Sequence, residues 1–142
     1  AHTYETLLAQ GHYFIDGAEE LLETLYGQYR MYLVTNGTLS VQKGRLKSSG
    51  ISRYFEGIFI SEELGYNKPG REYFDCCFSR IPDFHKETAV IIGDSLTSDI
   101  QGGINAGIRT IWFNPSHEKT SEIIPDYEFD SLMKLPELLS HI

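Results

Sequence analysis

Short apolar runs alternate with amphipathic stretches along this chain, and few folds accommodate that alternation. The apolar runs typical of buried strands lie at residues 31–34, 58–60, 89–92 and 110–113. The stretches expected to form helices lie before and between them, at residues 18–25, 39–49, 74–81 and 98–106. Strands that alternate with helices predict a parallel sheet with helices on both faces, a three-layer α/β/α fold of the Rossmann-like kind.

The ends of the expected helices carry residues that commonly terminate helices. Gly27, Gly50 and Gly107 each follow one of these stretches, and glycine adopts the left-handed backbone conformation of a helix end without steric penalty. Beyond residue 113 the chain is punctuated by Pro125 and Pro136. We expect this tail to contain one more short strand and a terminal helix.

Length and charge narrow the class of protein further. The chain has 142 residues, of which 41% are hydrophobic, and a formal net charge of −8. That length fits one domain with a buried core and excludes a second full domain. Because the chain is acidic and has no run of Lys and Arg, we expect neither a nucleic acid nor a membrane surface as partner. Oligomeric state is not predicted by any feature of the sequence.

Cysteine usage and hydropathy bear on the compartment. Cys76 and Cys77 are adjacent in the sequence, which is poor geometry for a disulfide that closes a loop. No apolar run approaches the ~20 residues that a transmembrane helix needs. The simplest interpretation is a protein of a reduced, cytoplasmic compartment.

Polar residues gather where the predicted strands end. Thr35 and Asn36 follow the first run, Lys68 lies beyond the second, and Asp94 and Asp99 follow the third. In open parallel sheets, ligands bind in the crevice beyond the carboxyl ends of the strands. We therefore expect these side chains to lie at one edge of the sheet.

Each of these residues allows a chemical and a merely structural interpretation. Two carboxylates that straddle a strand-to-helix turn suit Mg²⁺, although Asp99 also suits a helix N-terminus and Asp94 a turn. Lys68 could neutralise a phosphate, or be a solvated loop lysine. Thr35 could donate its hydroxyl to a phosphate oxygen beside the backbone N–H of Asn36, or serve the turn alone.

The joint order of these residues resembles the haloacid dehalogenase (HAD) superfamily of phosphohydrolases. Thr35 would be that family's second motif, Lys68 the third, and Gly93-Asp94 with Asp99 the fourth, continued by QGGINAGIRTIWFNP. The last stretch is similar to the branch that contains pyrimidine nucleotidases. The resemblance implies a HAD-like core, Mg²⁺ as cofactor, and a small phosphorylated substrate such as a nucleotide.

The resemblance also implies a role for each residue. Asp94 would be a direct Mg²⁺ ligand, and Asp99 would support metal-bound water or Lys68. Lys68 would neutralise charge as part of the catalytic group, while Thr35, Asn36 and Lys68 would bind the phosphate of the substrate. Phosphatases of the family attack phosphorus with an Asp carboxylate and form an aspartyl-phosphate, which water then hydrolyses.

The first motif of the family, Asp-x-Asp-x-Thr, is absent from these residues. No aspartate has another aspartate two residues away, and Asp16, the earliest, is better explained as a helix cap. We therefore expect a sheet that lacks its first strand, with residues 1–12 as the end of a helical cap and residues 13–142 as the core. On this hypothesis the nucleophile lies outside the chain, and the chain alone is inactive.

Other arrangements and functions remain open at this stage. The strands on either side of the missing one could pair directly, or another chain could donate a strand. A non-catalytic, HAD-like interaction protein is the main alternative function. A receiver-type signalling domain fits less well because its acidic pair precedes its Lys-Pro, and no phosphate-binding glycine motif of a nucleotide-binding module is present.

Overall fold

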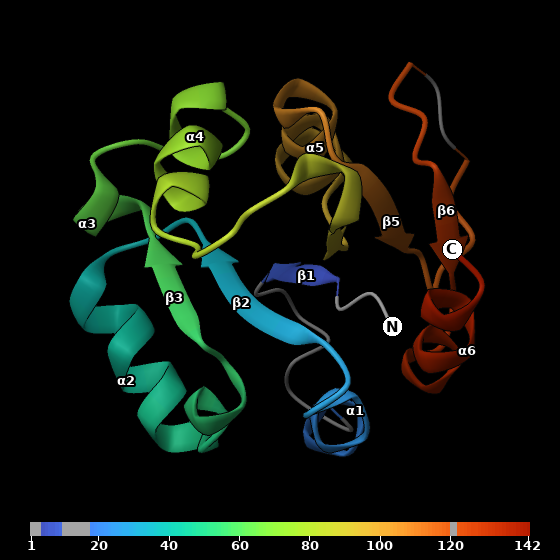
Figure 1. Cartoon of the computed structure of the whole chain (residues 1–142), viewed down its shortest axis with the longest axis horizontal. Coiled ribbons are helices and arrows are strands. Elements are labelled where there is room, and N and C mark those ends of the chain that lie inside the picture. The colour runs from blue at the N-terminus through green and yellow to red at the C-terminus, as the bar shows by residue number, and fades with distance from the viewer. Residues whose placement is uncertain (1–3, 10–17, 120–121) are drawn as a thin grey trace.

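The computed structural model describes residues 4–9, 18–119 and 122–142 (Figure 1). Its strands are β1 (Glu5–Ala9), β2 (Arg30–Thr35), β3 (Gly57–Ile60), β4 (Ala89–Gly93), β5 (Arg109–Phe113) and β6 (Tyr127–Phe129). Its α-helices are α1 (Ala18–Leu25), α2 (Leu39–Ser49), α3 (Ser61–Leu64), α4 (Arg71–Ser79), α5 (Gln101–Ala106) and α6 (Leu135–Ser140). A π-helical segment, Leu96–Ile100, leads into α5.

The strands form one sheet in the order β3-β2-β1-β4-β5-β6, and every neighbouring pair is parallel. The chain therefore builds one half of the sheet outward from β1 and then crosses over to build the other half from β4. The predicted α/β fold with a parallel sheet is confirmed. The predicted terminal strand and helix are also present, as β6 and α6.

Helices cover both faces of this sheet, as the alternation of segments predicts. Figure 1 shows α3, α4 and α5 on one side of the strands and α1, α2 and α6 on the other. Successive residues of β1 serve opposite faces: Leu7 and Ala9 contact the core beneath α4, whereas Leu8 contacts the core beneath α1. The strand side chains thus build two hydrophobic cores.

The helical conformation expected for residues 1–12, as the end of a cap, and the expected gap in the sheet are both wrong for the described part of that segment. Glu5–Ala9 is a strand, paired with β2 along one side and with β4 along the other. A run as short as this has no periodicity that separates helix from strand, and the two rows of backbone groups on β2 and β4 decide its conformation. The predicted boundary between residues 12 and 13 lies outside the described residues, as does Asp16.

Two glycines bring α5 close to its neighbours. A Cβ atom added to Gly102 would lie 2.6 Å from Phe74 of α4, and one added to Gly103 would lie 2.5 Å from Ile91 of β4. Such distances are far inside van der Waals contact, so only glycine lets the helix approach this closely. The close approach fixes the π-helical segment, and Asp99 within it, against the end of β4.

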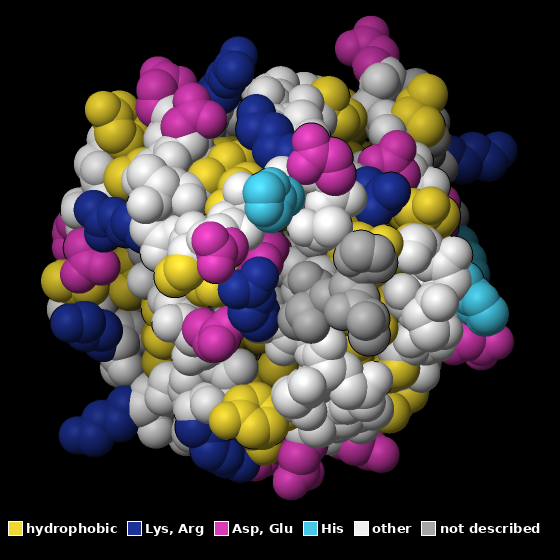
Figure 2. Space-filling view, viewed as in Figure 1, with side chains coloured by type: hydrophobic (Ala, Val, Ile, Leu, Met, Phe, Trp, Pro, Cys, Tyr) yellow, Lys and Arg dark blue, Asp and Glu magenta, His cyan; other side chains and the backbone are white. Residues whose placement is uncertain are grey.

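The surface is mixed in charge. Figure 2 shows acidic and basic side chains interspersed over the face viewed as in Figure 1, with small, separate apolar areas between them. Within the described ranges, no helix is long and apolar enough to cross a bilayer.

Candidate active site at the carboxyl ends of the strands

A buried ion pair joins the two halves of the sheet. Lys68, in the loop before α4, donates from Nζ to Oδ1 of Asp99 over 2.7 Å. The side chains are only 4% and 3% exposed. Nζ also donates to the carbonyl oxygen of Val34 on β2 over 3.4 Å. Charges this deeply buried must be paired and hydrogen-bonded, so the solvated-lysine interpretation of Lys68 is wrong.

Local structure at the end of β4 holds Asp99 in place. Its Oδ2 accepts the backbone N–H of Ser95, and its Oδ1 also accepts the hydroxyl of Ser98. A Cβ atom on Gly93 would lie 2.3 Å from Oδ2 of Asp99. The glycine therefore leaves the space that the carboxylate occupies, and any larger residue would push Asp99 away from Lys68.

Asn36 holds the main chain of Lys68. Its Oδ1 accepts the Lys68 N–H over 2.9 Å, and its Nδ2 donates to the Lys68 carbonyl oxygen over 3.1 Å. Both functional atoms of the amide are thus used by one residue. The Asn36 side chain positions Lys68, a role that the sequence did not indicate; the same residue's backbone N–H remains the predicted phosphate donor.

Thr35 is buried at the end of β2 and is fixed by Tyr73. The Thr35 N–H donates to the Tyr73 hydroxyl, which donates in turn to the carbonyl oxygen of Phe59 over 2.6 Å. Burial raises the pKa of Tyr73, so this hydroxyl keeps its proton. The Thr35 hydroxyl donates to the neighbouring Asn36 carbonyl oxygen over 3.2 Å.

Asp94 is half-buried at the tip of β4 and is held through its main chain. Trp112 on β5 donates from Nε1 to the Asp94 carbonyl oxygen over 3.1 Å. No hydrogen bond or ion pair to the Asp94 carboxylate occurs among the residues described. Asp94 lines a cavity of about 400 Å³ together with Trp112 and residues 113–116 and 118.

The donors at this edge suit a hard cation only in part. Mg²⁺ is commonly held by one or two carboxylates, with waters and substrate phosphates completing the shell. Asp94 offers such a carboxylate, and Asp99 lies nearby in the sequence but is paired with Lys68. Within the described ranges, no group of three or more His, Cys, Asp or Glu side chains could hold a metal. An ion at Asp94 would need further oxygen ligands.

The structure connects four of the predicted site residues through contacts and leaves one apart. Asn36, Lys68 and Asp99 form a continuous hydrogen-bonded chain, and Thr35 adjoins it through Asn36. Asp94 is adjacent in the fold, but no contact links its carboxylate to Lys68 or Thr35. Tyr73 and Trp112 were missed as site residues. Tyr73 could have been noticed, because its hydroxyl falls among the apolar residues of a helix.

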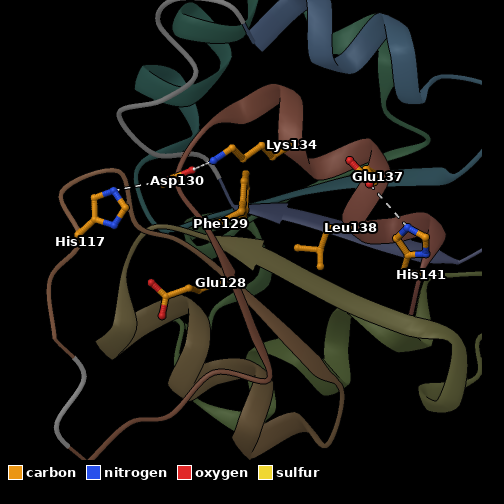
Figure 3. Close-up of a pocket in the computed structure, with 8 residues that line it drawn as sticks. All are labelled: His117, Glu128, Phe129, Asp130, Lys134, Glu137, Leu138 and His141. Atoms are coloured by element: carbon orange, nitrogen blue, oxygen red, sulfur yellow. Dashed lines mark hydrogen bonds and ion pairs between the residues drawn. The ribbon is translucent and has the colours of Figure 1, made fainter.

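A different cavity, of about 570 Å³, lies between β6 and α6 (Figure 3). Its charged groups other than Glu128 pair with one another: Asp130 contacts both His117 and Lys134, and Glu137 contacts His141. Glu128 accepts a hydrogen bond from Asn114. The hydrogen bond from Lys134 holds the pKa of Asp130 below its usual value. These self-paired surface groups offer no buried, convergent set of donors, so we place the candidate site at Lys68 and Asp99.

Comparison with known proteins identifies the family of the chain. A family model described as haloacid dehalogenase-like hydrolase matches residues 1–113. The chain is 46% identical over 138 residues to the HAD-hydrolase YfnB of Bacillus subtilis, covering 96% of this chain and 59% of that protein. It is 44% identical to the pyrimidine 5'-nucleotidase PynA of Streptococcus pneumoniae, covering 98% of this chain and 60% of that protein.

A solved structure supports the same relationship. The crystal structure of YfnB from Bacillus subtilis, bound to magnesium, superposes with a TM-score of 0.85 at 48% identity, over 88% of this chain and 55% of that one. The chain thus spans less than two thirds of the length of these relatives. By its family match, its relatives and its fold, the chain belongs to the haloacid dehalogenase-like hydrolases.

Proposed function

We propose that this chain is the larger part of a Mg²⁺-dependent phosphohydrolase that acts on small phosphomonoesters. The observation that carries the proposal is the buried Lys68–Asp99 pair, which brings a cation to the carboxyl edge of the sheet, the edge at which Asp94 follows β4. Asp99 compensates the cost of burying this cation, and a cation held at that edge suits an anionic ligand.

Lys68 would bind one phosphate oxygen and lower the repulsion between phosphate and nucleophile. An ammonium group has three N–H donors. Asp99 and Val34 accept from Lys68 Nζ, which leaves a donor for the substrate. Asn36 fixes the main chain of Lys68, so the cation is oriented before the substrate arrives, and orientation in advance is what makes such a group effective.

Thr35 and Asp94 would complete the phosphate site. On substrate binding the Thr35 hydroxyl would turn from the Asn36 carbonyl oxygen to a phosphate oxygen, and the backbone N–H of Asn36 would donate to another, as expected from the sequence. Asp94 would hold Mg²⁺, because its carboxylate has no partner among the described residues. Bound there, the cation would supply charge stabilisation to the transferring phosphoryl group.

The nucleophile would come from outside these residues, as an aspartate carboxylate. Its oxygen would attack phosphorus, the ester bond would break, and the leaving alkoxide would take up a proton to give an alcohol. Water would then attack the phosphorus of the aspartyl-phosphate, releasing inorganic phosphate and restoring the carboxylate. Two of the similar proteins are pyrimidine 5'-nucleotidases, so a nucleoside 5'-monophosphate is the first substrate to test.

The test compares this chain with the longer protein that carries it. Phosphate release from p-nitrophenyl phosphate and from nucleoside monophosphates is measured with and without Mg²⁺. We expect activity only from the longer protein, and a loss of about 10²-fold or more in kcat for Asp94→Asn, by analogy with the removal of one stabilising group from an active site. Asp130→Asn, at the cavity of Figure 3, is the matched control.

Two results would contradict the proposal. Full activity of the longer protein after Asp94→Asn would remove Asp94 from the site. Activity of the 142-residue chain itself, abolished by Asp94→Asn, would show that the nucleophile lies within these residues.

A further inference from the structure

Gln42 is a polar residue at a position of α2 where an apolar residue is expected. Among the described side chains of α2, the buried ones are Gln42 and Leu46, which are 6% and 4% exposed. They are four residues apart and therefore lie on the same face of the helix. The face of a helix that packs against a sheet is normally apolar. The Gln42 amide therefore needs an explanation other than packing.

The amide of Gln42 is only partly hydrogen-bonded. Its Nε2 donates to the Asn36 carbonyl oxygen over 3.2 Å. Its Oε1 is buried and has no hydrogen-bond partner in the ranges that the structure describes. A buried oxygen without a donor destabilises a fold, and an apolar side chain of similar length would avoid that loss. The bond that Nε2 makes is thus the feature that explains an amide at this position.

This bond holds the peptide group between Asn36 and Gly37, in the loop after β2. The carbonyl oxygen of the peptide accepts from Gln42 and from the Thr35 hydroxyl, each over 3.2 Å. The N–H of the same peptide donates to the Ser61 hydroxyl over 2.8 Å. A Cβ atom on Gly37 would lie 2.5 Å from Nε2 of Gln42, so the glycine leaves the space that the amide occupies. Both polar ends of this peptide are therefore held by side chains.

The two donors on the Asn36 carbonyl oxygen differ in what else they can do. The Thr35 hydroxyl has a single proton, so it cannot donate to a phosphate oxygen and to this carbonyl oxygen at once. If it were the only donor, its move to a phosphate would leave a carbonyl oxygen without a partner and weaken binding. Gln42 supplies the second donor, and a carbonyl oxygen can accept two.

We propose that Gln42 is a positioning residue of the phosphate site, which holds the Asn36–Gly37 peptide and keeps its carbonyl oxygen partnered when the Thr35 hydroxyl turns to a phosphate oxygen. The proposal rests on the function proposed above. Gln42 would not contact the phosphate itself, since its Nε2 is bonded to Asn36 and its Oε1 is buried. It acts through Thr35 and Asn36.

Binding of inorganic phosphate to the chain in the presence of Mg²⁺, followed by NMR titration, tests the proposal. Gln42→Met keeps an unbranched side chain of similar length and removes both amide atoms. We expect the Kd to rise about threefold to tenfold, the effect of one hydrogen bond. The melting temperature should not fall, because the unpartnered Oε1 is removed too. Gln28→Met is the matched control: it removes a bond from an exposed glutamine to the Thr24 carbonyl oxygen and should leave the Kd unchanged.

The same substitution in a Thr35→Val background separates positioning from a general effect on the loop. Valine has no hydroxyl to move, so the Asn36 carbonyl oxygen keeps the same partner, Gln42, before and after phosphate binds. Gln42→Met should then change the Kd by less than about twofold. An equal rise in both backgrounds would show that Gln42 affects only the shape of the loop. Either that result or an unchanged Kd for Gln42→Met alone would overturn the proposal.

A measurement without ligand separates this proposal from the proposed function. Hydrogen exchange of the Gly37 amide reports whether the peptide is held. We expect Thr35→Val to leave this amide protected, and Thr35→Val combined with Gln42→Met to speed its exchange about tenfold. If this pattern is found but the unsubstituted chain binds no phosphate, the proposed function is contradicted and the hold of Gln42 on the peptide stands. Fast exchange in Thr35→Val alone would overturn the role of Gln42.

Discussion

Lys68–Asp99 and Arg30–Glu5 are two ion pairs of one sheet, the first at the carboxyl ends of the strands and the second at their amino ends. Around the first pair, Asp99 receives N–H or O–H groups from Lys68, Ser95 and Ser98. Around the second, Glu5 and Arg30 each keep a buried atom that has no partner within residues 4–9, 18–119 and 122–142. The ion pair at the carboxyl ends of the strands is thus more completely hydrogen-bonded than the ion pair at the amino ends.

The difference in hydrogen bonding shows that the side-chain geometry is more fully determined at the carboxyl ends of the strands than at their amino ends. The partnered pair lies beside the residues proposed to bind phosphate, where a displaced cation would lose its function. The Arg30–Glu5 pair lies at the starts of β1 and β2, at the opposite end of the strands. One exception qualifies the contrast: Gln42 donates to the Asn36 carbonyl oxygen, and its own Oε1 is buried with no partner among the residues that the structure describes.

Removal of the Lys68 charge is expected to have the largest effect. Lys68→Met leaves Asp99 buried without its cation, and we expect a loss of about 3 to 5 kcal/mol in the free energy of unfolding. Urea denaturation measures it. Asp99→Leu added to Lys68→Met should recover much of the loss, because no buried charge then remains.

Lys134→Met is the control for that measurement. Lys134 and Asp130 form a pair of the same 2.7 Å length, but their side chains are 66% and 31% exposed. We expect no measurable change, since solvent screens exposed charges. A large loss from Lys134→Met, or none from Lys68→Met, would contradict the contrast between buried and exposed pairs.

Two buried threonines, one in each half of the sheet, are suited to a second comparison. Replacing each by valine should change the free energy of unfolding in opposite directions. The Thr110 hydroxyl accepts the N–H of Asp126 over 2.9 Å and donates to its carboxylate, so Thr110→Val should destabilise by about 1 to 2 kcal/mol. The Thr6 hydroxyl has no partner in the part of the chain that the structure describes, so Thr6→Val should stabilise by about 1 kcal/mol. If thermal or urea unfolding shows that both substitutions change the free energy of unfolding in the same direction, the stated difference in hydrogen bonding is wrong.

Asn36→Ala should loosen Lys68 without removing its charge. The variant loses two hydrogen bonds to the Lys68 main chain, at an expected cost of about 1 to 2 kcal/mol, and the Lys68 amide should exchange its hydrogen faster. Asn36→Asp keeps the acceptor for that amide and should preserve its protection. If the Lys68 amide is equally protected from hydrogen exchange in Asn36→Ala, Asn36 does not position Lys68.

The smallest expected effect is on how the stability of the fold depends on pH. The pKa of Glu5 is raised in the folded state by burial, so the folded protein holds this proton more tightly than the unfolded chain. Stability should therefore fall as the pH rises from the ordinary carboxyl value, 4.5, through the raised folded-state pKa. Glu5→Gln should flatten that slope in unfolding curves, whereas Glu23→Gln, at an exposed position, should leave it unchanged. If the dependence of stability on pH is unchanged in Glu5→Gln, other titratable groups cause it.

Much of the fold follows from local patterns that tertiary contacts did not override. The spacing of Leu21, Leu22 and Leu25 predicted α1, and the run from Ala89 to Ile92 predicted β4. Gly50 ends α2 in the left-handed conformation, as expected. Glu5–Ala9 was assigned wrongly because its conformation depends on two strands that are distant in sequence, and no local pattern records them.

The candidate site was predictable as a set of residues but not as a set of contacts. Motif order placed Thr35, Lys68 and Asp99 at one edge, because parallel strands end together. The partners of Asn36 were not predictable, since an amide side chain can bind substrate, solvent or main chain equally well in principle. Its actual partner, Lys68, is fixed by how the loop before α4 packs over the end of β2.

The hydrogen bond from Trp112 to Asp94 gives the molecule a built-in optical reporter. Trp112 is the sole tryptophan of the chain, and its indole nitrogen is attached to the backbone of the residue proposed to hold the cation. Indole emission shifts when the hydrogen bond of the ring nitrogen changes. Occupancy at the tip of β4 can therefore be followed by intrinsic fluorescence, without a dye or a label.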